Sequence, residues 1–158
     1  MKRRNGRLPA GLGWCLFITG NQEMHEPKPN SVGSGQSNRA LIYVVDDEPM
    51  LLELASVILE PRGYRIETYG DPESALQAFK AADPPPALII TDFAMHEMTG
   101  MELMEACRQV RPGQKVLLVS GTVGPDIFGV ADDKPDRFLG KPYQSMQLID
   151  MVKELLAD

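Results

Sequence analysis

The stretch Ala40-Leu41-Ile42-Tyr43-Val44-Val45-Asp46-Asp47-Glu48-Pro49 decides the fold class. Its first six residues form an unbroken apolar run, which is typical of a central strand in a parallel sheet covered by helices on both faces. The run ends at two aspartates, and Pro49 stands where the first turn of a helix tolerates proline. A buried strand that passes through acidic residues into a helix is the start of a β/α unit.

The same alternation continues along the chain. We expect further strands over Arg65–Tyr69, Ala87–Thr91, Lys115–Val119 and Arg137–Leu139, with a last helix over Gln144–Leu156. Gly and Pro residues between Ser120 and Phe138 leave room for only a shortened fourth helix. The pattern predicts an α/β fold with a doubly wound, five-stranded parallel sheet and helices on both faces.

Charge divides the chain into two parts. Residues 1–39 carry six Lys or Arg against two Glu, a net charge of +4, whereas residues 40–158 carry 10 basic and 20 acidic side chains, a net charge of −10. An acidic body repels phosphate backbones and anionic lipids, so we expect it to bind neither nucleic acid nor membranes. Because residues 27–38 are rich in Pro, Gly and Ser, we interpret 1–39 as a flexible, disordered basic tail and linker, and 40–158 as the folded domain.

The N-terminal tail also bears on localisation. No apolar stretch reaches the roughly 18 residues of a membrane-spanning helix. Leu8–Thr19 follows basic residues as a secretory signal does, but Pro9 and two glycines interrupt it and no A-x-A-like cleavage site follows. We therefore expect a cytoplasmic protein, with Met24 as an alternative initiator.

Cys15 and Cys107 have no disulfide or zinc-site spacing, which predicts free thiols.

Polar side chains stand at the ends of four predicted strands. Asp46 and Asp47 follow the first strand, Asp92 the third, Ser120 the fourth and Lys141 the fifth. Since the carboxyl ends of parallel strands lie at one edge of the sheet, we expect them to converge on one site. Three carboxylates repel one another by about 4 kcal/mol per pair at 4 Å if the effective dielectric is near 20, so they need a cation. Lys141 supplies one charge, and an all-oxygen donor set suits Mg²⁺ better than zinc.

This constellation has the parts for phosphoryl transfer. One aspartate could attack a phosphoryl group and form an acyl phosphate, while Mg²⁺ and Lys141 neutralise the charge. The hydroxyl of Ser120 could donate to a phosphoryl oxygen, and Gly121 leaves room for that group.

With these motifs, residues 40–158 resemble the receiver domain of bacterial two-component response regulators. The motifs that carry the resemblance are Val44-Val45-Asp46-Asp47-Glu48, Thr91-Asp92-Phe93-Ala94-Met95, Val119-Ser120-Gly121 and Gly140-Lys141-Pro142, in the order of the family. The resemblance implies a flavodoxin-like sheet with strand order 2-1-3-4-5 and a role in phosphorelay signal transduction. It implies that Asp92 accepts a phosphoryl group from a sensor histidine kinase or a histidine phosphotransfer protein.

The resemblance also implies roles for the other site residues. Mg²⁺ would be bound directly by Asp47, Asp92 and the backbone carbonyl of Ala94, with Asp46 assisting through water. Lys141, in a cis peptide with Pro142, would contact the phosphoryl group. Ser120 would follow that group and couple to Phe138, at the aromatic switch position of the family. His96 departs from the family pattern, which commonly has proline there.

Three interpretations of function remain open. Because the sequence ends at Asp158 directly after the last helix, we expect a stand-alone receiver that switches its binding to a downstream protein, with a phosphorylation-dependent homodimer as a further expectation. Such a protein is not an enzyme beyond its own phosphorylation and dephosphorylation. One rival is a phosphatase of the haloacid-dehalogenase type, but Ala94 stands where that family has a second aspartate. The other rival is a phosphate-independent scaffold.

Overall fold

The computed structural model describes residues 39–122, 124 and 134–157. The elements in chain order are β1 (Leu41–Val45), α1 (Pro49–Leu59), the 3-10 turn η1 (Glu60–Arg62), β2 (Arg65–Tyr69), α2 (Pro72–Ala81), β3 (Leu88–Asp92), α3 (Gly100–Val110), β4 (Val116–Ser120), β5 (Arg137–Gly140) and α4 (Ser145–Ala157). The predicted tail, apart from Arg39, lies outside the described residues. The predicted shortened fourth helix falls mostly on residues outside them as well, so the helix labelled α4 is the last helix of the prediction.

The five strands form one parallel sheet with the order β2-β1-β3-β4-β5. This confirms the strand order that the family resemblance implies. The direction of winding reverses at β1, which pairs with β2 on one side and β3 on the other. In sheets of this kind ligands bind at the carboxyl ends of the strands beside that reversal. The sheet therefore places the ends of β1 and β3 side by side at the expected position of a site.

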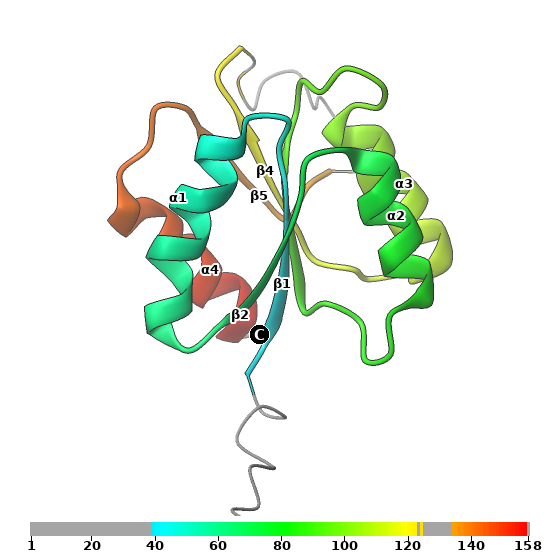
Figure 1. Ribbon diagram of the computed structural model, residues 1–158, viewed down its shortest axis with the longest axis horizontal. Helices are drawn as coiled ribbons and strands as arrows, with labels where there is room; N and C mark the ends of the chain where they lie inside the picture. Colours follow the sequence, from blue (N-terminus) through cyan, green and yellow to red (C-terminus); the bar gives the residue numbers. More distant parts are fainter. Residues whose placement is uncertain (1–38, 123, 125–133, 158) are drawn as a thin grey trace, which may run out of the picture. The chain divides into compact units, whose positions relative to one another are not determined.

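Helices cover the sheet on both faces, with α1 and α4 on one side and α2 and α3 on the other (Figure 1). All five residues of β1 are buried, and they alternate between the two hydrophobic clusters that the helices make with the sheet. Ile42 and Val44 pack with α1 and α4, whereas Tyr43 and Val45 pack with α2 and α3. This double covering explains why the strand has no polar face.

Several predicted element bounds are wrong by one residue, since β3, β4 and α4 each start and end one residue later than predicted and β5 also ends one residue later. Strands β3 and β4 each end one residue later than predicted and so include Asp92 and Ser120, and α4 begins at Ser145 rather than Gln144. The reason is that the backbone keeps its sheet pairing beyond the apolar run: the N–H of Phe93 still donates to the carbonyl of Val119, and the N–H of Lys141 to that of Ser120. A polar side chain at the end of an apolar run therefore does not mark the point where the backbone hydrogen bonds between strands end.

Two further features of the described residues bear on the expectations above. Cys107 on α3 is a buried free thiol, and burial raises its pKa to about 11. No helix in the described part of the chain has the length and apolar character needed to cross a bilayer.

Candidate functional site

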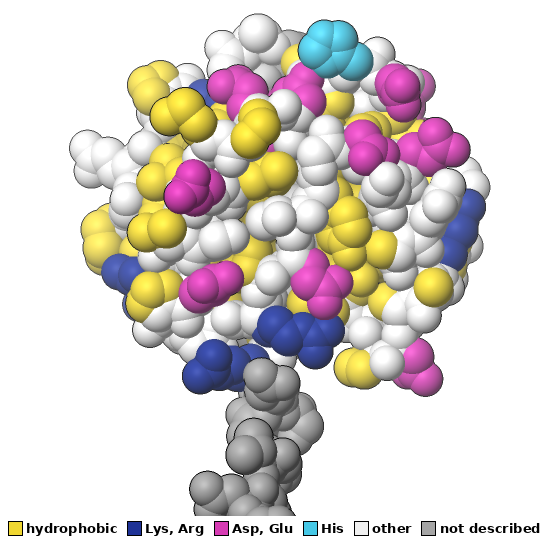
Figure 2. Space-filling model, viewed as in Figure 1, with side chains coloured by type: hydrophobic (Ala, Val, Ile, Leu, Met, Phe, Trp, Pro, Cys, Tyr) yellow, Lys and Arg dark blue, Asp and Glu magenta, His cyan; other side chains and the backbone are white. Residues whose placement is uncertain are grey.

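The site lies at the edge of the sheet where the strands have their carboxyl ends. Asp92 and Ser120 are the last residues of β3 and β4, and Asp46 and Lys141 directly follow β1 and β5. Asp46, Asp92 and Ser120 are buried, with 6%, 7% and 2% of their residue surface exposed to solvent. Acidic side chains gather at this edge of the molecule (Figure 2). Buried carboxylates need compensation by hydrogen bonds or opposite charge, and the geometry supplies both.

Lys141 lies between the two buried carboxylates. Its Nζ is 2.7 Å from Asp92 Oδ1 and 2.9 Å from Asp46 Oδ2. Burial of the ammonium acts to lower the pKa of Lys141, but the hydrogen bonds and charges of Asp92 and Asp46 outweigh burial and raise that pKa above its ordinary value. Lys141 is therefore a fixed positive charge at the side chain of Asp92.

Backbone amides hold the other oxygen of each carboxylate. The N–H of Glu48 donates to Asp46 Oδ1 at 2.9 Å, and the N–H of Ala94 donates to Asp92 Oδ2 at 2.8 Å. Both contacts span two residues, so they form in the turn that immediately follows each strand. Each aspartate is thus oriented by its own turn on one side and by Lys141 on the other.

Asp47 stands apart from this pair. It is only partly buried, and its Oδ2 lies 2.7 Å from Nδ1 of His96, whose side chain is 91% exposed. His96 is an exposed loop residue, and its contact with Asp47 is a feature that sequence reasoning missed. The two residues are far apart in the chain, and only the pairing of β1 with β3 brings their loops together.

Ser120 is held by the loop that follows it. The N–H of Thr122 donates to Ser120 Oγ at 3.2 Å, and the hydroxyl of Thr122 is 3.4 Å from the same atom. Phe138 lies on the neighbouring strand, where it pairs with Leu118, two positions before Ser120 and on the same face of the sheet. Phe138 is partly exposed. Sequence reasoning placed Ser120 at the site but did not identify Thr122.

The loop between β3 and α3 is closed tightly over the end of β3. The N–H of Gly100, the first residue of α3, donates to the carbonyl of Phe93 at 3.0 Å. A Cβ atom at Gly100 would overlap the carbonyl oxygen of Asp92 and press on Leu118. Gly100 therefore helps to position the backbone of Asp92, because only a residue without a side chain fits this close to it. The Lys141–Pro142 peptide bond is cis, which confirms the sequence expectation for that bond.

The donor set fits a hard divalent cation better than a softer one. Within the described residues, no group of three His, Cys, Asp or Glu side chains is arranged to hold a metal ion as the side chains stand. Mg²⁺ does not require three, because it is usually held by one or two carboxylates and keeps several waters. Asp47 has an oxygen that no contact described above uses, and the carbonyl of Ala94 is a further oxygen donor in the same loop. The residues present therefore fit Mg²⁺ by their chemistry.

The fold defines an α/β protein with a doubly wound parallel sheet, in which the carboxyl ends of the strands are the expected position of a ligand site. The model of the response regulator receiver domain family matches residues 42–153, and the chain belongs to that family. It is thus a receiver domain of two-component phosphorelay signalling, and the haloacid-dehalogenase alternative finds no support.

Three similar proteins illustrate the range of the family. The chain is 32% identical over 117 residues to the probable transcriptional regulatory protein TcrX of Mycobacterium tuberculosis, covering 73% of this chain and 49% of TcrX. It is 26% identical to the response regulator receiver protein CpdR of Brucella abortus, covering 75% of this chain and 97% of CpdR. A crystal structure of the response regulator TrrA from Thermotoga maritima in complex with Mg²⁺-BeF superposes with a TM-score of 0.65 at 28% identity, covering 74% of this chain and 99% of that one.

The chain spans about half the length of the first curated relatives it matches. Another similar protein, of which the chain covers 51%, is named a DNA-binding response regulator, MtrA of Mycolicibacterium smegmatis. The receiver family is therefore established for this chain by residues 42–153.

Proposed function

We propose that this protein is a phosphorylation-controlled binding module in which Asp92 is the phosphoacceptor. The observation that carries the proposal is the environment of the Asp92 carboxylate, with Lys141 Nζ at Oδ1 and the N–H of Ala94 at Oδ2. A fixed cation and a fixed N–H donor beside a nucleophile are the elements that phosphoryl transfer requires, because the protein contributes mainly positioning and charge stabilisation.

In the proposed reaction a carboxylate oxygen of Asp92 attacks the phosphorus of a phosphohistidine. The new O–P bond gives an acyl phosphate, the P–N bond breaks, and the departing imidazole takes up a proton from solvent. Lys141 then contacts the phosphoryl oxygens, and Ser120 donates its hydroxyl to one of them. The order of strands supports these roles, since β3, β4 and β5 carry the three residues to one edge.

Mg²⁺ is the proposed cofactor. Asp47, Asp92 and the carbonyl of Ala94 would hold it directly and Asp46 through water, and the bound cation would neutralise charge that develops on the phosphoryl group. Binding requires Asp47 to turn from His96 or to offer its other oxygen. The Mg²⁺-BeF complex of the Thermotoga maritima relative supports this assignment.

The proposed partners follow from this chemistry. The donor is a sensor histidine kinase or a histidine phosphotransfer protein, which requires a cytoplasmic location for this domain, and the output is a changed affinity for a downstream protein or for a second copy of this chain. The domain itself contributes only phosphorylation and dephosphorylation of Asp92 and turns over no other substrate. The acidic body, with a net charge of −10 over residues 40–158, supports an output through protein contacts rather than through nucleic acid by this part of the chain.

A labelling experiment tests the proposal. Incubation with acetyl phosphate and Mg²⁺ should add one phosphoryl mass that hydroxylamine removes, and Asp92→Asn should abolish it. Asp150→Asn, which changes an exposed aspartate of α4, is the matched control and should be labelled like wild type. Labelling that persists in the Asp92→Asn protein would assign the phosphoacceptor to another residue.

A further inference from the structure

Strand β5 leads directly to Lys141, yet its own burial does little to fix its position. It is the last strand of the sheet and lies against β4. Of its four residues, Arg137–Gly140, Leu139 alone is buried. The register of a strand is specified strongly where one whole face is buried and weakly where it is not. The position of β5 along β4 therefore depends on contacts at the two ends of the strand.

The contact at the carboxyl end belongs to the site itself. The N–H of Lys141 donates to the carbonyl of Ser120 at 2.7 Å. Both residues are also proposed to contact the phosphoryl group, so this end of β5 is exposed to change when the site is filled. The amino end is the part of β5 that can be held independently of the site.

At the amino end, Asp136 makes two hydrogen bonds with the start of β4. Its N–H donates to the carbonyl of Val116 at 3.0 Å, and its Oδ2 accepts the N–H of Val116 at 2.7 Å. Asp136 directly precedes β5, so these bonds hold the chain one residue before the first strand pair. Because the backbone and the side chain of Asp136 both bond to Val116, a slip of β5 along β4 would break both bonds.

Arg108, on α3, in turn holds Asp136. Its side chain is only 19% exposed, and it donates from Nη2 to Asp136 Oδ2 at 2.9 Å, from Nη1 to the carbonyl of Lys134 at 2.7 Å and from Nε to the carbonyl of Gln114 at 3.2 Å. The guanidinium group is planar and rigid, so its three contacts fix the relative positions of the segments that they join. One side chain therefore connects α3 with the residues that lead into β4 and into β5.

We propose that the ion pair of Arg108 with Asp136 fixes β5 along β4 and thereby keeps Lys141 at Asp92, an inference that rests on the function proposed above. Arg108 and Asp136 are positioning residues, because they lie at the amino end of β4 and β5, opposite the site. A slip of one residue moves a strand by about 3.3 Å and turns its side chains to the other face of the sheet. The 2.7 Å contact between Lys141 Nζ and Asp92 Oδ1 would not survive such a displacement.

The proposal predicts a loss of reaction rate and not only of stability. Lys141 supplies the positive charge beside Asp92, and a displacement of about 1 Å in a positioned group can slow a reaction about 100-fold. Asp92 itself is oriented on β3 by the N–H of Ala94, which does not involve β5. Removal of the ion pair should therefore impair the contribution of Lys141 and leave the phosphoacceptor in place.

Hydrogen exchange measures how firmly β5 is held. In Arg108→Met and in Asp136→Ala, the N–H of Lys141 should exchange at least about tenfold faster than in wild type, because β5 opens locally. The N–H of Arg65, which donates to the carbonyl of Ala40 beside β1, is the internal reference and should change less. An equal change at both N–H groups would report a general loss of stability and would contradict the proposal.

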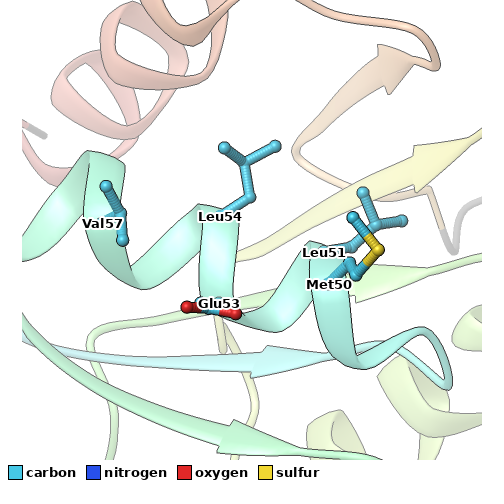
Figure 3. A pocket seen from close by; sticks show the side chains of 5 residues that line it. All are labelled: Met50, Leu51, Glu53, Leu54 and Val57. Atoms are coloured by element: carbon cyan, nitrogen blue, oxygen red, sulfur yellow. The ribbon is translucent and has the colours of Figure 1, made fainter.

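The second measurement is the rate at which acetyl phosphate and Mg²⁺ label Asp92, followed by mass spectrometry. Arg108→Met and Asp136→Ala should both be labelled about tenfold more slowly than wild type. Glu53→Ala is the matched control for Asp136→Ala, because it removes an exposed carboxylate of α1, which Figure 3 shows beside apolar side chains of that helix. This control should be labelled at the wild-type rate.

Two further controls separate the effect from loss of an arginine and from loss of stability. Arg62→Met removes an exposed arginine of η1 that donates to the carbonyl of Ile58. Ala75→Gly weakens α2 in its interior, where glycine is unfavourable. At a temperature at which thermal melting shows every variant to be folded, both controls should be labelled at the wild-type rate.

A double-mutant cycle separates positioning of Lys141 from any other effect of Arg108. Arg108→Met should slow labelling of the wild-type chain but should not slow labelling of Lys141→Met further, because no lysine remains to be positioned. Slow rates are obtained from the fraction labelled after long incubation.

The other outcomes are also decisive. The same slowing by Arg108→Met with and without Lys141 would contradict the proposal, since the arginine would then act independently of the lysine. Wild-type labelling rates in Arg108→Met and Asp136→Ala would overturn it as well. Failure of acetyl phosphate to label wild type would instead overturn the proposed function, while the hydrogen-exchange result would still report whether the ion pair holds β5.

Discussion

Lys141 is the residue on which the charge balance of the site depends. It contacts two carboxylates of buried residues, and its own side chain is 19% exposed. Without a cation, the two carboxylates would repel each other at the end of the sheet. This agrees with the expectation from the sequence that the clustered aspartates need a positive charge. The raised pKa of Lys141 means that its stabilising contribution is fully present below the ordinary lysine pKa and is lost only as the pH rises through the raised value.

We therefore expect Lys141→Met to lower the free energy of unfolding by about 3 kcal/mol, as is usual when one partner of a buried ion pair is removed. The difference from wild type should stay constant between neutral and mildly alkaline pH, because Lys141 remains charged throughout that range. Urea denaturation at several pH values measures both quantities. Lys153→Met, at an exposed lysine of α4, should have little effect. A Lys141→Met protein as stable as wild type would show that the carboxylates need no cation.

Asp47 and His96 offer a second test at the scale of single residues. Asp47→Ala removes a proposed direct ligand and should weaken Mg²⁺ binding by about tenfold or more, since even outer partners of metal ligands contribute that much. His96→Ala removes only the contact with Asp47 Oδ2 and should leave the affinity unchanged or higher. Isothermal titration with Mg²⁺ distinguishes the two variants. Weakened binding in His96→Ala would show that His96 helps to hold the cation rather than competing with it for Asp47.

At the scale of elements, the junction of β3 with α3 depends on the absence of a side chain. Gly100→Ala would drive a methyl group into the carbonyl of Asp92 and should destabilise the protein by roughly 1–3 kcal/mol, the usual effect of overpacking. Gly70→Ala is the matched control, because nothing lies within 4 Å of its added Cβ and its φ is not positive. Urea denaturation should separate the two, and equal stabilities would mean that α3 can shift away from β3 without loss.

The elements that the sequence predicts well are those fixed by burial. The apolar run of β1 predicts a central strand because only a strand covered on both faces lacks polar positions, and the structure confirms its place between β2 and β3. The convergence of Asp46, Asp92 and Lys141 follows from strand order alone. The Asp47–His96 contact could not be predicted in this way, because it joins two loops whose side-chain conformations depend on the completed fold.

The same distinction applies to Thr122 and Gly100. The hydrogen bonds between Thr122 and Ser120 form within a turn whose geometry the sequence leaves open. Gly100 packs closely on Asp92 where the start of α3 meets the end of β3. The distance between these two elements cannot be predicted from the local sequence of either one. Sequence reasoning therefore reaches the residues of the site but not the contacts that hold them in place.

At the scale of the whole molecule, the phosphoryl group must change something far from Asp92 to be read by a partner. It can bias an equilibrium between two conformations only by interacting differently with them, and reversing a ratio of 1:99 requires about 5.5 kcal/mol. A hydrogen bond from Ser120 to a charged group supplies about 1.5–3 kcal/mol. The contact with Lys141 must therefore contribute to the switch, or the switch must be partial.

The register of the sheet suggests the route by which such a change would spread. Ser120 pairs with Gly140 and Leu118 pairs with Phe138, so the two predicted switch residues lie on one face of adjacent strands, two positions apart. Movement of Ser120 toward the phosphoryl group would break its contacts with Thr122 and alter the space beside Phe138.

We expect Ser120→Ala to accept phosphate at Asp92 but to shift less toward the active conformation, and Phe138→Ala to uncouple partner binding from phosphorylation. NMR chemical shifts of β5 and α4, recorded with and without beryllofluoride and Mg²⁺, measure this shift. Changes in both variants as large as those of wild type would exclude the route through Ser120 and Phe138, because the response would then reach α4 without either side chain.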